Sequence, residues 1–246
     1  MDEAGKRRAQ ARRTASVARA FDRSWSSILA SPGWWPATPQ VGCTRLLREA
    51  ADPAAVVTSP DFMTHLGRSL RQWRAFRGAR FDERRLRRSL DRVAPLLGRW
   101  VGTSLLRLRG EGGHDLFELF DAVGDVKLTE RRWVATSKLL YHLLPDLVVP
   151  MDNLATAPFL GRSQLPVAFD AAFVEETYAA FAELASSVGA ARVRKAANAV
   201  PFPVPGAARQ DCRIGMARVV DFAIAGYVRD QGRAALHRRK HSKAKR

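Results

Sequence analysis

Three side chains that could do chemistry lie close together near the middle of the chain. Lys138 and His142 are four residues apart, and Asp152 follows shortly after them, next to Asn153. A lysine amine, an imidazole and a carboxylate are groups that serve as nucleophile, base or acid. We therefore treat Asp152, Lys138 and His142 as candidate catalytic residues.

An alternative role for Asp152 follows from its place after Pro150 and before Pro158. An aspartate there can cap a helix, because its carboxylate accepts hydrogen bonds from the free backbone amides at a helix N-terminus. Both roles are compatible with the sequence. No other pattern supports a metal or a nucleotide cofactor, since the chain has no HExxH, Cys/His cluster, GxSxG elbow or glycine-rich phosphate loop.

The candidate residues belong to a helix that we expect to open at Thr129 and to end at Pro145. Helical spacing places one set of side chains on the core face and another on the opposite, polar arc. The core set is Trp133, Ser137, Leu140, Tyr141 and Leu144, and the polar set is Arg131, Lys138 and His142. The apolar run 147–149 predicts a buried extended connection that leads to Asp152.

The remainder of the chain reads as amphipathic helices, and no alternating strand pattern of useful length occurs. We predict an all-α fold, a single compact multi-helix domain over residues 14–236 with a possible hinge at the proline-rich run 198–206. A helix should start at Ser59 and run to about residue 77, and Pro95 should kink or split the next one. Residues 1–13 lack apolar side chains and predict a basic arm, disordered or loosely helical, and residues 237–246 predict a basic tail.

Composition limits the compartment. No apolar run approaches the ~18 residues of a membrane helix, and no apolar block follows the basic N-terminus as in a secretory signal. The two cysteines, Cys43 and Cys212, lie far apart without spacing partners, which favours a reducing compartment. We expect a cytoplasmic protein.

The formal net charge of +17 is unevenly distributed. Residues 68–109 hold 13 basic and 3 acidic side chains, whereas residues 110–228 hold 11 and 14. Arg84, Arg88 and Arg92 recur every four residues and so share one helix face, and a second cluster in the tail contains Arg238, Arg239 and Lys240. Concentrated positive charge predicts a polyanion partner, and the partner that we expect is nucleic acid, DNA before RNA. The alternatives are an arginine face paired with acids of the negative block, or arginine use that reflects only a genome rich in G and C.

Residues 138–161 resemble part of the helix-hairpin-helix base-excision DNA glycosylase superfamily. The resemblance rests on the apolar helix, Pro145-Asp146, Pro150-x-Asp152 and the closing Leu160-Gly161. It implies an all-helical fold, binding of duplex DNA, base flipping, an aspartate at Asp152 and a lysine at Lys138. The Leu-Pro-Gly-x-Gly hairpin of that superfamily is missing, and only residues 122–125 stand near its place.

Three hypotheses follow for the function. The first is a nucleic-acid-binding helical protein, with glycosidic cleavage assisted by Asp152 as an added step. The second is a non-catalytic helical interaction protein. The third is an unrelated enzyme that uses His142 and Asp152 on a small molecule.

Overall fold

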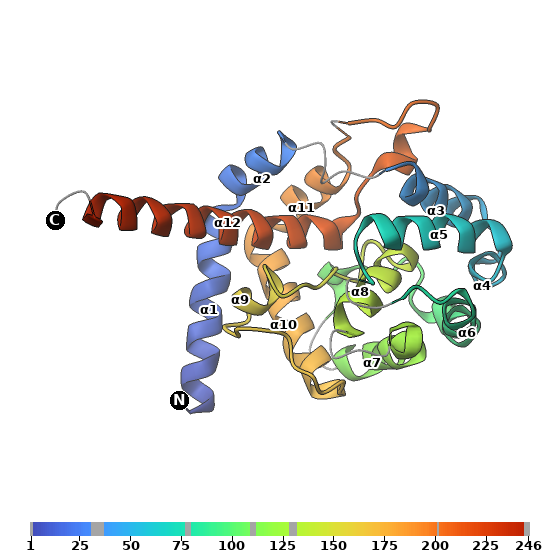
Figure 1. The fold of residues 1–246 in the computed structure, drawn as a ribbon, viewed down its shortest axis with the longest axis horizontal. Coiled ribbons are helices and arrows are strands. Elements are labelled where there is room, and N and C mark those ends of the chain that lie inside the picture. Colours follow the sequence, from blue (N-terminus) through green and yellow to red (C-terminus); the bar gives the residue numbers. More distant parts are fainter. Residues whose placement is uncertain are drawn as a thin grey trace.

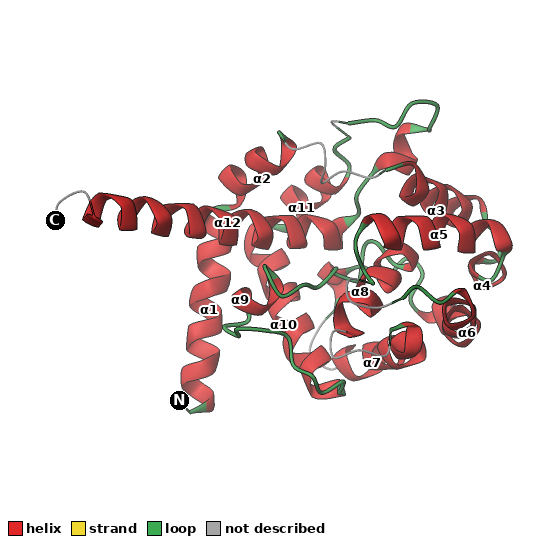
Figure 2. Ribbon diagram, viewed as in Figure 1, coloured by secondary structure: helices red, strands yellow, loops and turns green. Residues whose placement is uncertain are grey.

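The computed structural model describes residues 2–30, 37–76, 80–108, 112–127, 132–200 and 202–243, with side chains left out at 112–114 and 233–243. Every regular element in these ranges is a helix, as the sequence predicts (Figure 2). The α-helices are α1 (Glu3–Arg19), α2 (Phe21–Leu29), α3 (Thr38–Glu49), α4 (Pro53–Val57), α5 (Pro60–Gln72), α6 (Glu83–Val93), α7 (Gly112–Val123), α8 (Arg132–Leu143), α9 (Thr156–Phe159), α10 (Ala171–Val188), α11 (Ala190–Ala197) and α12 (Met216–Lys243). Short 3-10 turns are η2 (Ala94–Arg99), η3 (Leu105–Arg107), η4 (Gly124–Val126) and η5 (Arg209–Cys212).

Helix α8 lies at the centre and α12 crosses the molecule beside it, with the C-terminal half of α12 projecting away from the other helices (Figure 1). Nearly all side chains of α8 are buried, including Trp133, Leu139 and Leu140. A helix that is buried all round lies inside a domain rather than on its surface. Of its described side chains, Arg132, Val134 and Lys138 are partly exposed.

Several helix boundaries follow from local chemistry. Ser59 caps α5 by accepting a hydrogen bond from the Phe62 amide at 3.3 Å. The predicted break at Pro95 is confirmed, because α6 ends at Val93 and η2 takes over. Residues 147–149 are fully buried without being helical, as expected for a buried connection.

The end of one helix differs from the expectation. Helix α5 ends at Gln72 rather than about residue 77, because Arg74 adopts the left-handed conformation (φ 52°) that closes the helix. Residues 3–13 are helical and belong to α1, which corresponds to the helical alternative for this arm. One contact that anchors it is polar, since the Arg13 guanidinium donates to the Phe159 carbonyl oxygen at 2.7 Å.

None of the described helices is both long enough and apolar enough to cross a membrane. Cys43 and Cys212 are buried free thiols.

Candidate functional site

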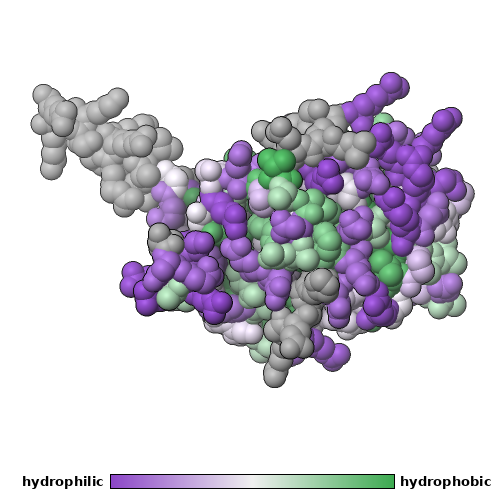
Figure 3. All heavy atoms as spheres, turned by 90° about the horizontal axis from the view of Figure 1, so that it is seen from below, coloured by the Kyte–Doolittle hydropathy of each residue, from purple (hydrophilic) through white to green (hydrophobic). Residues whose placement is uncertain are grey.

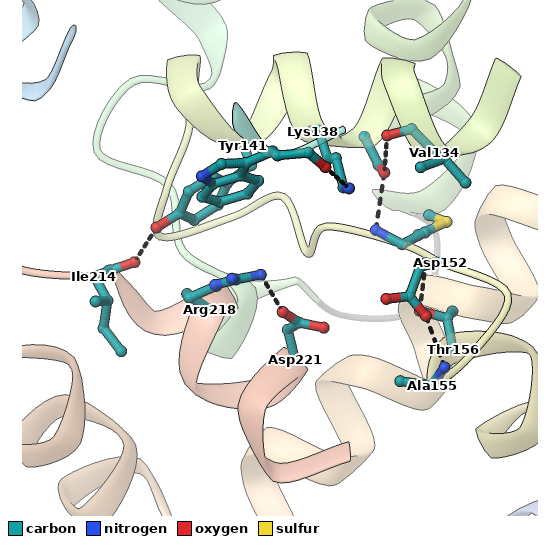
Figure 4. A network of polar contacts seen from close by, with 12 residues as sticks. Val134, Lys138, Tyr141, Asp152, Ala155, Thr156, Ile214, Arg218 and Asp221 are labelled. Carbon is teal, nitrogen blue, oxygen red and sulfur yellow. Dashed lines mark hydrogen bonds and ion pairs between the residues drawn. The ribbon is translucent and has the colours of Figure 1, made fainter. Parts of the chain in front are cut away.

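The structure brings Lys138 and Asp152 to one place, where α8 and α12 meet the loop that follows Pro150. Lys138 descends from α8, Arg218 and Asp221 rise from the first turns of α12, and Asp152 faces them from the loop (Figure 4). We call these four residues the polar cluster. Arg218 and Asp221 form an ion pair within α12.

Asp221 is the most buried acid of the polar cluster, with 5% of its surface exposed. Burial raises the pKa of its carboxyl group to about 6, because the charged form loses its hydration. The charge of Arg218 lowers the same pKa, and the nearby charge of Asp152 raises it. The cluster therefore contains a carboxyl group that exchanges protons near neutral pH, a property suited to acid–base work.

Lys138 connects the polar cluster to the end of α5. Its ammonium group donates to the Trp73 carbonyl oxygen at 2.6 Å. A cation is favourable there, since the last carbonyl groups of a helix are free and carry partial negative charge. The Trp73 ring in turn stacks on Tyr141 at a centroid distance of 5.3 Å and lies 4.4 Å from the Arg218 guanidinium carbon.

Asp152 acts as a local cap. One carboxylate oxygen accepts from the amides of Leu154 at 2.8 Å and Ala155 at 2.7 Å. The capping interpretation of this residue is thus realised, although the capped turn precedes α9 instead of belonging to it. One carboxylate oxygen of Asp152 accepts both hydrogen bonds of the turn. The second oxygen is available to the polar cluster.

His142 is not a surface residue of the polar arc, and that expectation was wrong. Its ring is 4% exposed and packs on Trp73 at 4.9 Å. Nδ1 bonds the Lys138 carbonyl oxygen at 2.6 Å, and Nε2 bonds the Ser69 hydroxyl at 2.7 Å. Burial lowers the pKa of His142 to about 4. A neutral imidazole with both nitrogens engaged positions α8 against α5, and it has no nitrogen left for a base.

Tyr141, the neighbour of His142, also joins elements. Its hydroxyl donates to the Ile214 carbonyl oxygen and accepts from the Gln40 side chain at 3.2 Å. Burial raises its pKa, so it stays protonated. These bonds fix α8 to α3 and to the segment that enters α12.

Arg218 and Asp221 were not singled out from the sequence. A signal for Asp221 exists, because it is the one charged residue in the apolar run Val219–Ala225. An acid in such a run must be paired or protonated if the run is buried. Arg218, one turn earlier, is the partner that spacing would suggest.

A basic surface lies on α5 and α6. Arg84, Arg87 and Arg88 are exposed and form no ion pair with any residue that the structure describes. They line an open depression of about 930 Å³. Figure 3 shows hydrophilic residues over much of this face, including the side of the molecule that carries α5 and α6.

Phe81 joins α5 to this surface. Arg71 of α5 lies over its ring at 4.7 Å, and a methyl group at Gly67 would come within 3.1 Å of the ring edge. Arg68 and Arg71 of α5, and Arg74 just after it, are exposed, and Arg71 reaches toward α6 through its contact with Phe81. We call Arg68, Arg71, Arg74, Arg80, Arg84, Arg87 and Arg88 the arginine surface.

Arg92 does not belong to the arginine surface in the way its spacing suggests. It bonds the Asp125 carboxylate at 3.0 Å and the Ala122 carbonyl oxygen at 2.8 Å. The alternative of pairing with the acidic block thus holds for this residue. The backbone of Arg238, Arg239 and Lys240 belongs to α12, but their side chains lie outside the described part of the structure. Arg131 lies outside the described residues altogether.

Within the described residues, no three His, Cys, Asp or Glu side chains are grouped to hold a metal ion. The chain matches no protein-family model, and no curated protein or solved structure matches it significantly. The proposed function therefore rests on the polar cluster and the arginine surface.

Proposed function

We propose that this protein binds nucleic acid through the arginine surface and its basic ends. The observation that carries the proposal is the set of exposed guanidinium groups on α5 and α6 that lack acidic partners among the described residues. Like charges at this density repel one another, and phosphate groups relieve the repulsion while releasing counterions from the nucleic acid. Duplex DNA is the expected form, in line with the resemblance of residues 138–161.

A matched pair of double variants tests the proposal. Arg84→Gln with Arg88→Gln removes two charges from the arginine surface, whereas Arg194→Gln with Lys195→Gln removes two exposed charges from α11. Binding is measured to a short duplex, a single strand and an RNA hairpin over a salt series. Each phosphate contact contributes about 0.9 to the logarithmic salt slope on duplex DNA.

We expect the α6 variant to lower the slope by about 2, and the α11 variant to leave it unchanged. Equal slopes for both variants would show that the charge of α6 is compositional and would favour a non-catalytic interaction protein. Equal affinity for the duplex, the single strand and the RNA hairpin would show that the binding is only nonspecific electrostatic attraction.

The polar cluster favours a second, added function, cleavage of a glycosidic bond. Lys138 meets the Trp73 carbonyl oxygen at the end of α5, so the cluster adjoins a helix that carries part of the arginine surface. An ionised Asp152 would stabilise the positive charge that develops on the sugar after a base is flipped from the duplex.

Asp152→Asn separates this role from capping, because an amide oxygen still accepts from the two turn amides. Release of a base from lesion-containing duplexes, scored as abasic sites, should be lost in this variant while duplex affinity is kept. Asp170→Asn, at the cap of α10 where Asp170 accepts from the Phe173 amide at 2.8 Å, is the control. Full activity in Asp152→Asn would rule out the cleavage role.

A further inference from the structure

A cavity of about 540 Å³ lies apart from the arginine surface and is used by neither proposed function. It opens between α3, residues 100–103, the end of α8 and residues 210–215. Its volume falls within the range of small-molecule pockets, which is about 300–1,000 Å³. Pro53 and Leu97 complete the lining, so several separate parts of the chain meet at this cavity.

One wall of the cavity is apolar and includes Leu47, Pro53, Leu97 and the ring of Trp100. Trp100 is 8% exposed, and its indole N–H has no hydrogen-bond acceptor among the described residues. The nitrogen itself is shielded from solvent, so Trp100 offers the cavity an apolar ring surface.

Arg213 also lines the cavity. Its Nη2 bonds both oxygens of Asp146, at 3.3 and 3.2 Å. No bond from its Nε or Nη1 to a described residue is present, and its side chain is 40% exposed. A guanidinium group with one edge occupied retains donors that match a carboxylate. The second arginine of the lining, Arg48, is already engaged by Asp211 at 2.8 Å and by Glu49.

We propose that this cavity binds a small organic carboxylate with an apolar, ring-sized body. The body packs against Trp100 and Leu97, while the carboxylate oxygens accept hydrogen bonds from the free donors of Arg213. The proposal is independent of nucleic-acid binding. His142 lines the same cavity and bonds the Lys138 carbonyl oxygen, so an occupied cavity contacts the helix that carries the polar cluster.

The test uses 4-phenylbutyrate as the probe and the isosteric neutral amide, 4-phenylbutyramide, as its control. Binding is followed on the full-length protein by the indole N–H resonances of its six tryptophans. The Trp100 resonance is assigned by its absence from Trp100→Phe. We expect that resonance to move with the probe, and the amide to bind about tenfold or more weakly, because a charge-assisted hydrogen bond is lost.

Arg213→Gln should weaken 4-phenylbutyrate about tenfold or more and leave the weak binding of the amide unchanged. Arg209→Gln, an exposed arginine on the neighbouring η5 that does not line the cavity, is the matched control and should change neither. If Trp100→Phe does not fold, the Arg213 pair alone decides the question. A Trp100 resonance that stays in place at saturating probe, or equal affinity for acid and amide, would overturn the proposal.

Discussion

At the scale of single residues, Asp221 has the most consequential surroundings. It is buried beside Arg218, and the charge of Asp152 is close enough to oppose its ionisation. When the Asp221 carboxyl group is ionised, it loses its hydration and is repelled by the carboxylate of Asp152. When it is protonated, its ion pair with Arg218 is weakened. Because burial is the largest effect, the protonated form is favoured up to about pH 6.

This balance predicts a pH-dependent stability. The pKa of Asp221 is raised in the folded protein from its ordinary 3.8 to about 6, so its contribution is fully present below pH 3.8 and is lost as the pH rises through 6. The Asp221→Asn variant has no carboxyl group to ionise at this position, so it does not lose this stability as the pH rises. The stability of the variant relative to wild type should increase between pH 4 and pH 7, by at most roughly 3 kcal/mol. Urea unfolding at several pH values measures it.

His142 has the opposite tendency and must be separated from Asp221. Its pKa is lowered to about 4, so its contribution is present above pH 6.5 and is lost as the pH falls through 4. It is common to both proteins and cancels in the difference. Asp91→Asn, an exposed acid on α6, serves as the control variant. A difference between Asp221→Asn and wild type that stays constant with pH would contradict the argument.

The sequence predicts the candidate site in part. Residue type and proximity select Lys138 and Asp152, and the structure brings these two together. The helical pattern wrongly placed His142 on the polar arc, because histidine is classed as a polar residue. The ring is buried because Ser69, which belongs to another helix, completes its hydrogen bonds, and this contact is not visible in the sequence. Arg218 and Asp221 come from distant sequence, so only tertiary packing brings them to Lys138.

At the scale of elements, the site depends on how the end of α8 meets the start of α12. Gly215 has φ +75°, and a methyl group there would lie 2.3 Å from the Pro145 carbonyl oxygen. Asp146 accepts from the Met216 amide at 2.8 Å, and Pro145 accepts from the Ala217 amide at 3.2 Å. These contacts cap the first turn of α12, which carries Arg218 and, one turn later, Asp221.

Gly215→Ala should therefore destabilise the protein more than backbone strain alone explains. Gly102 has a similar φ, +79°, with nothing within 4 Å of its added methyl group, so Gly102→Ala measures strain, about 1–2 kcal/mol. We expect Gly215→Ala to cost at least roughly 2 kcal/mol more, because the carbonyl oxygen must move and the capping bonds break. The midpoints of urea unfolding compare them, and equal midpoints would show that the junction adapts.

Element prediction is sharp where apolar periodicity is strong and leaves alternatives open where a polar side chain decides the outcome. Helix α10 runs from Ala171 to Val188, over a stretch whose apolar residues recur at helical spacing. The N-terminal half of α1 has almost no apolar residues to give a signal. What holds it is Arg13, whose guanidinium group fits so closely over Gly161 that a methyl group there would lie 2.8 Å from it.

At the scale of the whole molecule, the positive charge divides into groups with different roles. The arginine surface is exposed and largely unpaired among described residues, whereas Arg13 and Arg92 hold elements together. Composition cannot make this distinction, because each arginine counts equally toward the net charge of +17. A truncation that removes residues 1–13 to test a basic arm would also remove a structural contact.

Removing the contact of Arg13 should lower the stability of the whole domain. Arg13→Ala leaves the Phe159 carbonyl oxygen without its partner, while Arg12→Ala, one residue earlier, removes an exposed side chain of equal charge. An unsatisfied acceptor that is partly buried costs about 1–3 kcal/mol, which lowers the melting temperature of a chain this size by roughly 2–10 °C.

Arg12→Ala and removal of residues 237–246 should both leave the melting temperature within about a degree, since a lone exposed charge contributes little. If Arg13→Ala and Arg12→Ala melt together, α1 is held by its apolar contacts alone, through Val17 and Phe21 of the following turns. The expected separation would mean that one set of basic residues supports the fold, and that binding experiments should remove only the other.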